Sequence, residues 1–318
     1  MAIRGKEASG NLSGIDAMNS AVCTLFEGDY HYGVGALVNS LHRYGYQGSV
    51  EVGYRGNLPT WMHDAKAVLK GTSITLRFHP LQTDWHLTNY KPRFLLELFS
   101  ADPALDRIFY FDPDIVIKCS WEFFEYWAES GVALVEEIAT HGMAYNHPLR
   151  RKWVEIANGL GISVKPTFSQ YFSGGFIGVR RSMMRHLQDW ARIMEHLPAL
   201  GIDLRRFMPA DRLHPFCGTD QDAMNIFAMA TAPFLSTIGP EGMDFIPGGF
   251  TMSHAVGSPK PWRKNYLLSA LKGIKPSAAD KAFWDNAATP IRVFPASLVR
   301  QRHATIHLSS LIGRFYHR

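Results

Sequence analysis

Short apolar runs alternate with amphipathic segments along most of the chain. Runs of apolar and β-branched residues bounded by turn residues predict strands, and such runs lie at residues 21–26, 49–54, 73–78, 132–136 and 176–179. Apolar residues at helical spacing predict helices, and they lie at residues 34–44, 91–99 and 182–197 and in a segment opening at Asp220, with Thr219 as its N-cap. This alternation predicts an α/β fold in which helices cover both faces of a mostly parallel central sheet.

The expected organisation is one α/β domain between a leader and a tail. Residues 1–20 are polar and rich in glycine and serine, which predicts a loose leader, and residues 21–285 are expected to form the domain. Residues 286–318 form a basic tail, because no acidic residue follows Asp285 whereas arginines stand at 292, 300, 302, 314 and 318. The net charge of +5 therefore belongs largely to this tail. That distribution argues against a nucleic-acid groove across the domain.

The composition favours a cytoplasmic protein. Cys23, Cys119 and Cys217 are widely spaced and form no Cys-x-x-Cys pair, which suits a reducing compartment better than a disulfide framework. No apolar run approaches the length of about 18 residues that a membrane-spanning helix needs. The N-terminal segment also lacks the apolar stretch of a signal peptide.

The tail carries an amphipathic pattern of its own. Apolar and aromatic residues fall at helical spacing, with Arg314 and Arg318 turned away from their face: Leu308, Leu311, Ile312, Phe315 and Tyr316. A basic helix with aromatic residues can lie in a membrane interface. The sequence therefore permits peripheral contact with the inner membrane face, and equally a helix packed on the enzyme body or a disordered end.

Two carboxylates interrupt the apolar run at residues 107–117. Asp112 and Asp114 are two positions apart in a predicted strand, where side chains at i and i+2 point to the same face. Their mutual repulsion requires a cation, and carboxylate oxygens suit Mg²⁺ or Mn²⁺. Ligands bind at the carboxyl ends of strands in parallel sheets, and the pair stands late in its run. An isolated Asp-x-Asp pair is also common in ordinary turns, so a second motif is needed.

That second motif is the segment from Ser253 to Trp262. His254 is followed by Gly257 three residues later and by Lys260 six residues later. An imidazole nitrogen suits Mn²⁺ as a third ligand beside two carboxylates. A glycine lets the backbone approach a phosphate, and a lysine supplies a positive charge for it. Together with Asp112 and Asp114, these residues predict a site for a metal-bound diphosphate.

With both motifs in place, the chain resembles the retaining glycosyltransferases of the glycogenin, galactinol synthase and bacterial lipopolysaccharide galactosyltransferase family (glycosyltransferase family 8-like). The resemblance covers residues 21–262 and implies the Rossmann-like GT-A fold. It implies metal binding by Asp112, Asp114 and His254, with Mn²⁺ (or Mg²⁺) as the cofactor. It also implies phosphate binding by Gly257 and Lys260.

The remaining site residues rest on the same resemblance. It implies uracil contact by Tyr30, with Asp29 beside it, and a diphosphate contact by Lys91. The segment of Asp220, Gln221 and Asp222 matches the part that faces the donor sugar. Ser173 stands where the family commonly has asparagine, which changes one sugar or acceptor contact.

The function expected is the transfer of a hexose from a UDP-sugar to a hydroxyl of a glycan, lipid-linked or polyol acceptor, with retention of configuration. Attack from the leaving-group side is favoured over a protein nucleophile, because the amide of Gln221 is a poor nucleophile. Two alternatives remain open. A sugar-phosphate nucleotidyltransferase would need a basic, glycine-rich loop after the first strand, where residues 26–30 are acidic instead. A non-catalytic nucleotide-sugar or glycan-binding module would be favoured by loss of a metal ligand, and none is lost.

Overall fold

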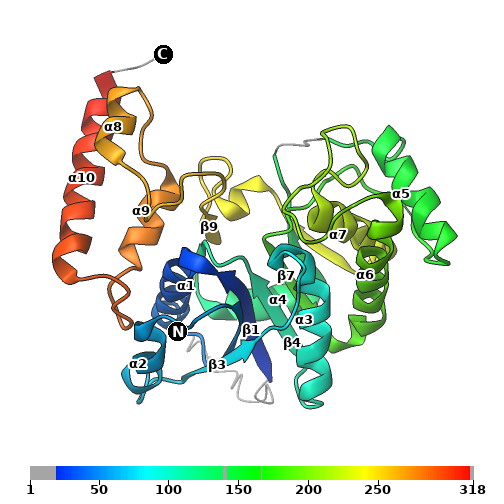
Figure 1. Cartoon of the computed structure of the whole chain (residues 1–318), viewed down its shortest axis with the longest axis horizontal. Coiled ribbons are helices and arrows are strands. Elements are labelled where there is room, and N and C mark those ends of the chain that lie inside the picture. Colours follow the sequence, from blue (N-terminus) through cyan, green and yellow to red (C-terminus); the bar gives the residue numbers. More distant parts are fainter. Residues whose placement is uncertain (1–18, 139–141, 166, 316–318) are drawn as a thin grey trace, which may run out of the picture.

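The computed structural model describes residues 19–138, 142–165 and 167–315. Strands and helices alternate along the chain, as the sequence pattern predicts (Figure 1). The strands are β1 (Ser20–Glu27), β2 (Gly48–Arg55), β3 (Ile74–Pro80), β4 (Arg107–Phe111), β5 (Ile115–Ile117), β6 (Val132–Val135), β7 (Phe176–Arg180), β8 (Leu235–Ile238) and β9 (Met252–His254). The α-helices are α1 (His31–Arg43), α2 (Thr60–Val68), α3 (Leu87–Ala101), α4 (Trp121–Ser130), α5 (Pro148–Gly159), α6 (Met184–His196), α7 (Thr219–Ala230), α8 (Tyr266–Leu271), α9 (Ala278–Asp285) and α10 (Ala296–Phe315). Short 3-10 helices are η1 (Gly28–Tyr30), η2 (Arg181–Met183), η3 (Leu197–Leu200), η4 (Ala232–Phe234) and η5 (Pro240–Met243).

Among the described residues, seven strands form the central sheet in the order β3-β2-β1-β4-β7-β6-β8. The pairs β1/β2, β1/β4, β2/β3 and β6/β8 are parallel, whereas β7 runs antiparallel to both of its neighbours. Because β7 is reversed, it begins at the edge of the sheet where β4 ends. The sheet is thus mostly parallel, as expected. The expected α/β architecture is confirmed.

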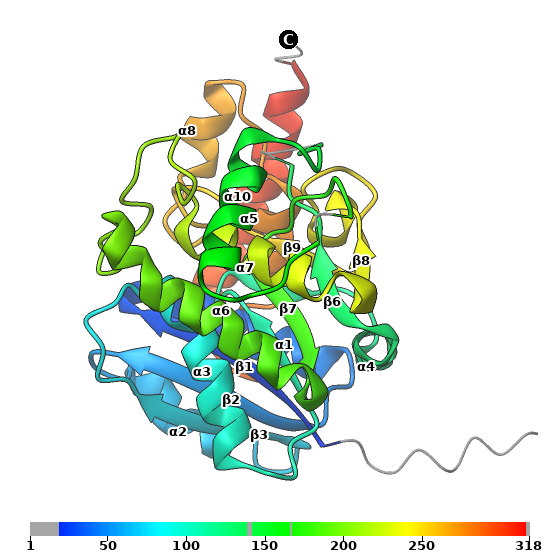
Figure 2. The same cartoon turned by 90° about the vertical axis from the view of Figure 1, so that its right-hand side faces the viewer.

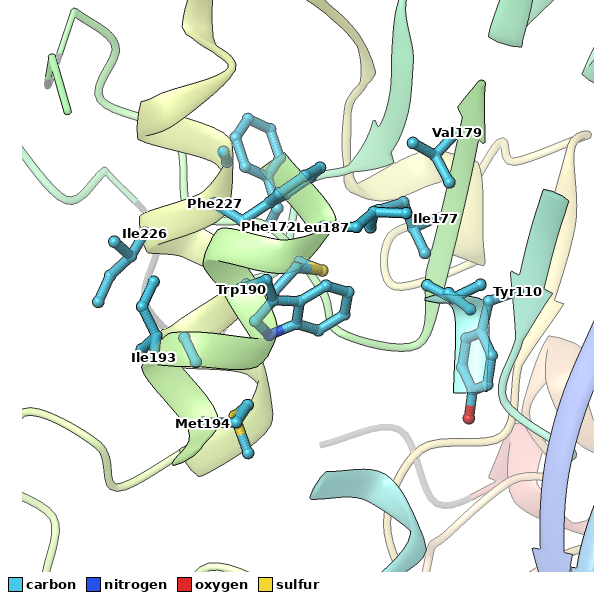
Figure 3. Packing of buried hydrophobic residues seen from close by; sticks show 14 of the residues in the cluster. Tyr110, Phe172, Ile177, Val179, Leu187, Trp190, Ile193, Met194, Ile226 and Phe227 are labelled. Carbon is cyan, nitrogen blue, oxygen red and sulfur yellow. The ribbon is translucent and has the colours of Figure 1, made fainter. Parts of the chain in front are cut away.

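Alternate residues of each central strand serve two different cores. In β4, Ile108 and Tyr110 face the core built with α3, α6 and α7, whereas Phe109 and Phe111 face the core built with α1 and α4. Figure 3 shows Trp190 of α6 among the strand and α7 side chains of the first core. Figure 2 shows α3 and α6 crossing one face of the sheet together. Helices therefore cover both faces, which excludes water from the buried strands.

The C-terminal segment packs on the domain. The Asn39 side chain of α1 donates hydrogen bonds to the backbone oxygens of Asn286 (2.7 Å) and Ile291 (2.9 Å), and its own oxygen accepts one from the Ile291 amide (2.8 Å). Helix α10 lies along α8 (Figure 1). The Arg302 guanidinium stands 5.5 Å from the ring centre of Trp284. The predicted helix in the tail is therefore present. The division at residue 285 remains a prediction. Residues 1–18 of the expected leader, Tyr316 and Arg318 lie outside the described residues, whereas Ser20, also assigned to the leader, begins β1.

One helix start differs from the sequence prediction. Helix α7 begins at Thr219, and its N-cap is Gly218 rather than Thr219. The Thr219 hydroxyl donates to the Phe216 carbonyl at 3.2 Å and so turns away from the amides of the first turn. The acidic first turn still follows the helix dipole, since Asp220 and Asp222 both lie in it. Within the described part of the chain, no helix has both the length and the apolar composition needed to cross a bilayer.

Candidate functional site

The two predicted metal carboxylates lie in a turn, not in a strand. Strand β4 ends at Phe111, and Asp112, Pro113 and Asp114 connect it to β5. Pro113 has no amide hydrogen to donate, so it interrupts the hydrogen-bond ladder between neighbouring strands. The Ile115 amide donates to the Asp112 carbonyl at 3.0 Å, which closes the turn. The expectation that strand alternation aligns the carboxylates is therefore wrong in its mechanism, although the two side chains do converge.

Two glycines allow other backbones to approach this turn closely. A Cβ on Gly33 of α1 would stand 1.9 Å from the Pro113 carbonyl oxygen, so α1 lies directly against the turn. A Cβ on Gly175, just before β7, would stand 2.6 Å from Cε1 of His254. The Asp112 amide donates to the Gly175 carbonyl at 2.7 Å. Any larger residue at either position would displace the turn or the imidazole.

The third predicted ligand, His254, reaches the turn through a small two-stranded sheet. Strand β9 pairs antiparallel with β5, and the register places His254 opposite Ile115, next to Asp114. The Nε2 atom of His254 lies 3.3 Å from Asp114 Oδ1 and 3.8 Å from Asp112 Oδ2. One ligand atom from each of the three residues lies within 4.8 Å of the other two. This set of one nitrogen and two carboxylates fits a divalent ion such as Mn²⁺.

Lys260 contacts the carboxylate oxygen of Asp114 that His254 does not contact. Its ammonium lies 2.5 Å from Asp114 Oδ2 and donates to the Ala255 carbonyl at 2.9 Å. Burial opposes ionisation of Asp114, but His254 and Lys260 together hold the pKa of its carboxyl below the usual range. Burial likewise disfavours the charged form of Lys260, yet Asp114 raises the pKa of this amine. Both groups are therefore charged at neutral pH.

The predicted nucleotide and phosphate residues surround Lys260. The ring of Tyr30 in η1 lies 5.6 Å from the Lys260 ammonium and 5.6 Å, edge-on, from the ring of Trp262. Asp29 accepts a hydrogen bond from the Trp262 indole at 2.8 Å and another from Arg263. Gly257 has a positive φ of 82°, and a Cβ there would meet only open space. The structure thus brings these residues to one end of the site.

Lys91 is buried between two acids rather than open to a ligand. Its ammonium donates to Asp220 Oδ2 and the Gly174 carbonyl, both at 2.8 Å, and stands 3.1 Å from Asp112 Oδ1. Burial works against its charge, but the two carboxylates raise the pKa of Lys91. Burial also raises the pKa of Asp220. The nearby Asp112 carboxylate raises it further, whereas the Lys91 ammonium lowers it. One ammonium is therefore shared by two carboxylates at the centre of the site.

The other two predicted donor-sugar residues hold the backbone around Asp220. Asp222 accepts hydrogen bonds from the Tyr171 hydroxyl (2.7 Å) and the Gly218 amide (2.6 Å). Gln221 accepts one from the Gly174 amide at 2.8 Å. These contacts join the start of α7 to the segment before β7. Burial raises the pKa of Asp222 to about 7.

The fold is that of known glycosyltransferases. The chain aligns over 92% of its length with the bifunctional glycosyltransferase WbbM in its apo form, at a TM-score of 0.56 and 17% identity. It aligns over 89% of its length with the galactosyltransferase LgtC in complex with donor and acceptor sugar analogues, at a TM-score of 0.52 and 14% identity. This chain has the GT-A glycosyltransferase fold. The resemblance seen in the sequence is thus confirmed for the fold.

Chain coverage differs among these structures. The chain spans 99% of LgtC but about half of WbbM, of which it covers 53%. It covers 64% of the glycosyltransferase GlyE of Streptococcus pneumoniae TIGR4, at a TM-score of 0.51 and 13% identity. No model of a known protein family matches the chain, and no curated protein matches its sequence. The shared fold therefore rests on structure alone.

The structure also reveals contacts that sequence reasoning missed. The pairing of Lys91 with Asp220 joins residues 129 positions apart, and the bond between Tyr171 and Asp222 spans 51 positions. No local pattern in the sequence marks either pair, because each bond joins elements that lie far apart along the chain. Ser173, expected near the sugar, is buried, and its hydroxyl accepts from the Gly175 amide at 3.3 Å.

Proposed function

We propose that the chain is a metal-dependent glycosyltransferase that moves a hexose from a UDP-sugar to a hydroxyl acceptor with retention of configuration. The observation that carries this proposal is the convergence of Asp112, Asp114 and His254, with Lys260 bonded beside them. This donor set and the half-buried ammonium of Lys260 suit a metal-bound diphosphate. The shared glycosyltransferase fold supports the same conclusion.

The donor would lie with its diphosphate at the carboxylate turn. Asp112, Asp114 and His254 would hold Mn²⁺ or Mg²⁺, which supplies positive charge to the leaving diphosphate. Lys260 adds to that charge as the sugar–phosphate bond breaks, and it can leave Asp114 for the diphosphate when an ion takes the carboxylate. Gly257 offers its backbone to the same phosphates. Tyr30, at the start of α1, gives the uracil an aromatic surface.

The donor sugar would lie toward Asp220. We infer that Asp220, fixed by Lys91, accepts hydrogen bonds from sugar hydroxyls, while Gln221 and Asp222 hold the surrounding backbone. The acceptor hydroxyl would attack from the leaving-group side, with the leaving phosphate taking its proton. Proton NMR of the fresh product tests retention. An anomeric configuration opposite to that of the donor would contradict it.

One experiment separates this function from its rivals. The purified chain is incubated with a panel of UDP-hexoses and Mn²⁺ without acceptor, and the release of UDP is measured. Slow release with at least one donor is the expected result. A requirement for a nucleoside triphosphate would instead indicate a nucleotidyltransferase. Tight binding of UDP-sugars without any release, even with glycan, lipid-linked and polyol acceptors added, would indicate a binding module.

We further propose a cytoplasmic enzyme that contacts the inner membrane face through its C-terminal helices. Support comes from exposed apolar side chains in α8, in the segment that follows it and in α10, which are 39% to 88% exposed: Leu268, Leu271, Ile274, Leu311 and Phe315. A Cβ on Gly313 of α10 would stand 2.5 Å from the Lys275 side chain, so the chain after α8 adjoins α10. The segment 245–279 contains no acidic residue, and neither does 286–318. A basic surface with exposed apolar side chains suits anionic lipid.

A further inference from the structure

We propose that Glu27, His86 and Phe207 form a subsite for a neutral sugar ring of the acceptor. This inference rests on the proposed glycosyltransferase function and names a part of the site to which no role has yet been given. The three residues come from distant parts of the chain. Glu27 ends β1 directly before η1, His86 is the N-cap of α3, and Phe207 lies in the connection between η3 and α7.

The subsite adjoins the buried ion pair at the centre of the site. His86 precedes Lys91 by five residues on α3, a rise of about 7 Å along a helix. Lys91 in turn holds Asp220. Asp29 and Tyr30 follow Glu27 within three residues. The subsite therefore lies close both to the nucleotide loop and to the proposed donor sugar.

Glu27 and His86 form a donor–acceptor pair without bonding to each other. The Thr88 amide donates to Nδ1 of His86 at 3.4 Å, and the Thr88 hydroxyl contacts the same nitrogen. When Nδ1 accepts from these groups, the proton of the neutral ring sits on Nε2. This Nε2 lies 4.0 Å from Oε1 of Glu27, which is too far for a direct hydrogen bond. One hydroxyl group between them can accept from the imidazole and donate to the carboxylate. Sugar hydroxyls have this double capacity.

Arg55 fixes the carboxylate in this position. Its Nε and Nη2 atoms donate to Oε2 of Glu27 at 2.8 and 2.6 Å. Its Nη1 donates to the carbonyls of Thr83 (3.1 Å) and Trp85 (2.9 Å), which anchors the guanidinium. Among the described residues, no hydrogen bond is donated to Oε1 of Glu27, so that oxygen is available to a ligand. A fixed acceptor loses little entropy when a hydroxyl binds.

Phe207 supplies an apolar surface beside this pair. Its side chain is 59% exposed, and its ring centre lies 5.4 Å from that of His86. The backbone before it is held to α3: the His86 amide and the Asn89 side chain both donate to the Leu204 carbonyl at 2.8 Å, and Asn89 also donates to the Arg206 carbonyl at 3.3 Å. An exposed aromatic ring on an anchored backbone is a suitable platform for the C–H face of a pyranose.

The occupant we assign is the acceptor, and its ring carries no negative charge. The proposed donor is already engaged by the carboxylate turn, Tyr30 and Asp220. Phe207 is more exposed than these groups, since Asp114 and Asp220 are buried and Tyr30 is half-buried, as expected for a ligand that arrives after the donor. The Glu27 carboxylate would repel the acid group of a uronic acid. A neutral hexose ring is therefore the class that fits.

The test measures sugar binding to the whole chain with the donor site filled. Protein saturated with UDP and diamagnetic Mg²⁺ is titrated with methyl β-D-galactopyranoside and methyl β-D-glucopyranoside, and saturation-transfer NMR reports binding. Phe207→Ala should weaken binding by about tenfold, the scale of losing one aromatic anchor. Glu27→Gln and His86→Asn should weaken it as well, with Asn retaining a capping side chain for α3.

A matched control and a competitor complete the design. Phe250→Ala removes a similarly exposed ring (61%) that lies by Phe123 instead, and it should bind the sugars as the wild type does. Methyl β-D-glucuronide should bind more weakly than the neutral sugars. Failure of both neutral sugars to bind the wild type would overturn the subsite, as would equal binding by Phe207→Ala.

Calorimetry with UDP alone distinguishes the acceptor from the donor. A loss of UDP affinity in Phe207→Ala would place the ring in the donor site and overturn the assignment. The acceptor-free release of UDP by the wild type reports separately on the proposed function. Sugar binding without UDP release, even with glycan, lipid-linked and polyol acceptors added, would refute the transferase proposal while leaving a sugar site.

Discussion

The Lys91 ammonium lies 2.8 Å from Asp220 Oδ2, and both side chains are buried. The same ammonium stands 3.1 Å from Asp112. One cation thus joins the carboxylate turn after β4 to the first turn of α7. The position of the proposed donor sugar relative to its diphosphate depends on this link.

Removing that cation should destabilise the fold. Lys91→Met leaves the buried Asp220 and the half-buried Asp112 without their shared partner, at an expected cost of about 3–5 kcal/mol in the free energy of unfolding. Urea denaturation measures this. The control is Arg93→Met on the same helix, whose exposed pair with Glu195 at 2.9 Å should contribute less than about 1 kcal/mol. Equal effects of the two substitutions would contradict the role assigned to Lys91.

Activity should require a divalent ion, Mn²⁺ ahead of Mg²⁺. Removal of metal with a chelator should abolish UDP release, and added Mn²⁺ should restore it. Asp112→Asn and Asp114→Asn should each lower turnover by about 100-fold or more, because each removes a charged ligand. Asp285→Asn, which changes an exposed acid near His303, serves as the control. Full activity in chelator would refute the metal assignment.

Lys260 should act mainly on the transition state. Lys260→Ala is expected to lower kcat/KM by an amount equivalent to about 2–4 kcal/mol of transition-state stabilisation. This is the scale seen when one preorganised electrostatic partner is lost. Steady-state kinetics with donor and Mn²⁺ provide the measurement. Lys272→Ala removes an exposed lysine of the chain after α8 and should leave the kinetics unchanged. Wild-type kinetics in Lys260→Ala would show that this ammonium only neutralises Asp114.

Asp222 should make stability depend on pH. Its pKa is raised from the ordinary value of 3.8 to about 7 in the fold, chiefly by burial. The folded state therefore binds the proton more tightly than the unfolded state does. The resulting stabilisation of the fold is fully present below pH 3.8 and is lost as the pH rises through 7. The difference amounts to at most about 4 kcal/mol. Asp222→Asn should flatten the unfolding free energy between pH 4 and 7.5, and parallel profiles for the two proteins would contradict this.

The exposed apolar side chains of α8, α10 and the segment after α8 should bind anionic vesicles. The double variant Leu271→Gln/Phe315→Ser should sediment less with phosphatidylserine vesicles than the wild type, because it removes two exposed apolar side chains. Leu213→Gln, at a residue that is 86% exposed elsewhere, is the control. Point variants are preferable to removal of the tail, since Val299 and Ile306 of α10 are buried. Equal sedimentation of all three proteins, or none, would refute the membrane contact.

The sequence predicted those parts of the fold that leave a local signal. Strand runs, helical spacing and the order of the metal motifs depend on neighbouring residues, and they identified Asp112, Asp114 and His254. The direction of β7 leaves no such signal, because an apolar run indicates burial but not polarity. The bond between Lys91 and Asp220 was missed for a related reason. It joins two elements that the sheet order alone brings together.

The residues that the sequence prediction missed also have a physical explanation. Phe207 lies in an irregular connection whose shape depends on hydrogen bonds from Asn89, and no periodic pattern marks it. The C-terminal segment has a basic composition that gave no indication of Ile291 entering the core beside Asn39. Composition describes the solvent-facing majority of a segment, whereas one or two buried residues determine where it attaches.

The absence of a side chain at Gly33 has a mechanical consequence. Helix α1 begins just after Tyr30 and, one turn later, rests its bare backbone on the Pro113 carbonyl with no deformable atoms between them. A displacement of the helix at its nucleotide end is therefore transmitted directly to the carboxylates on either side of Pro113. The proposed base-binding end and the proposed metal end of the site are thus in direct backbone contact, and the spacing between them would set the length of diphosphate that fits.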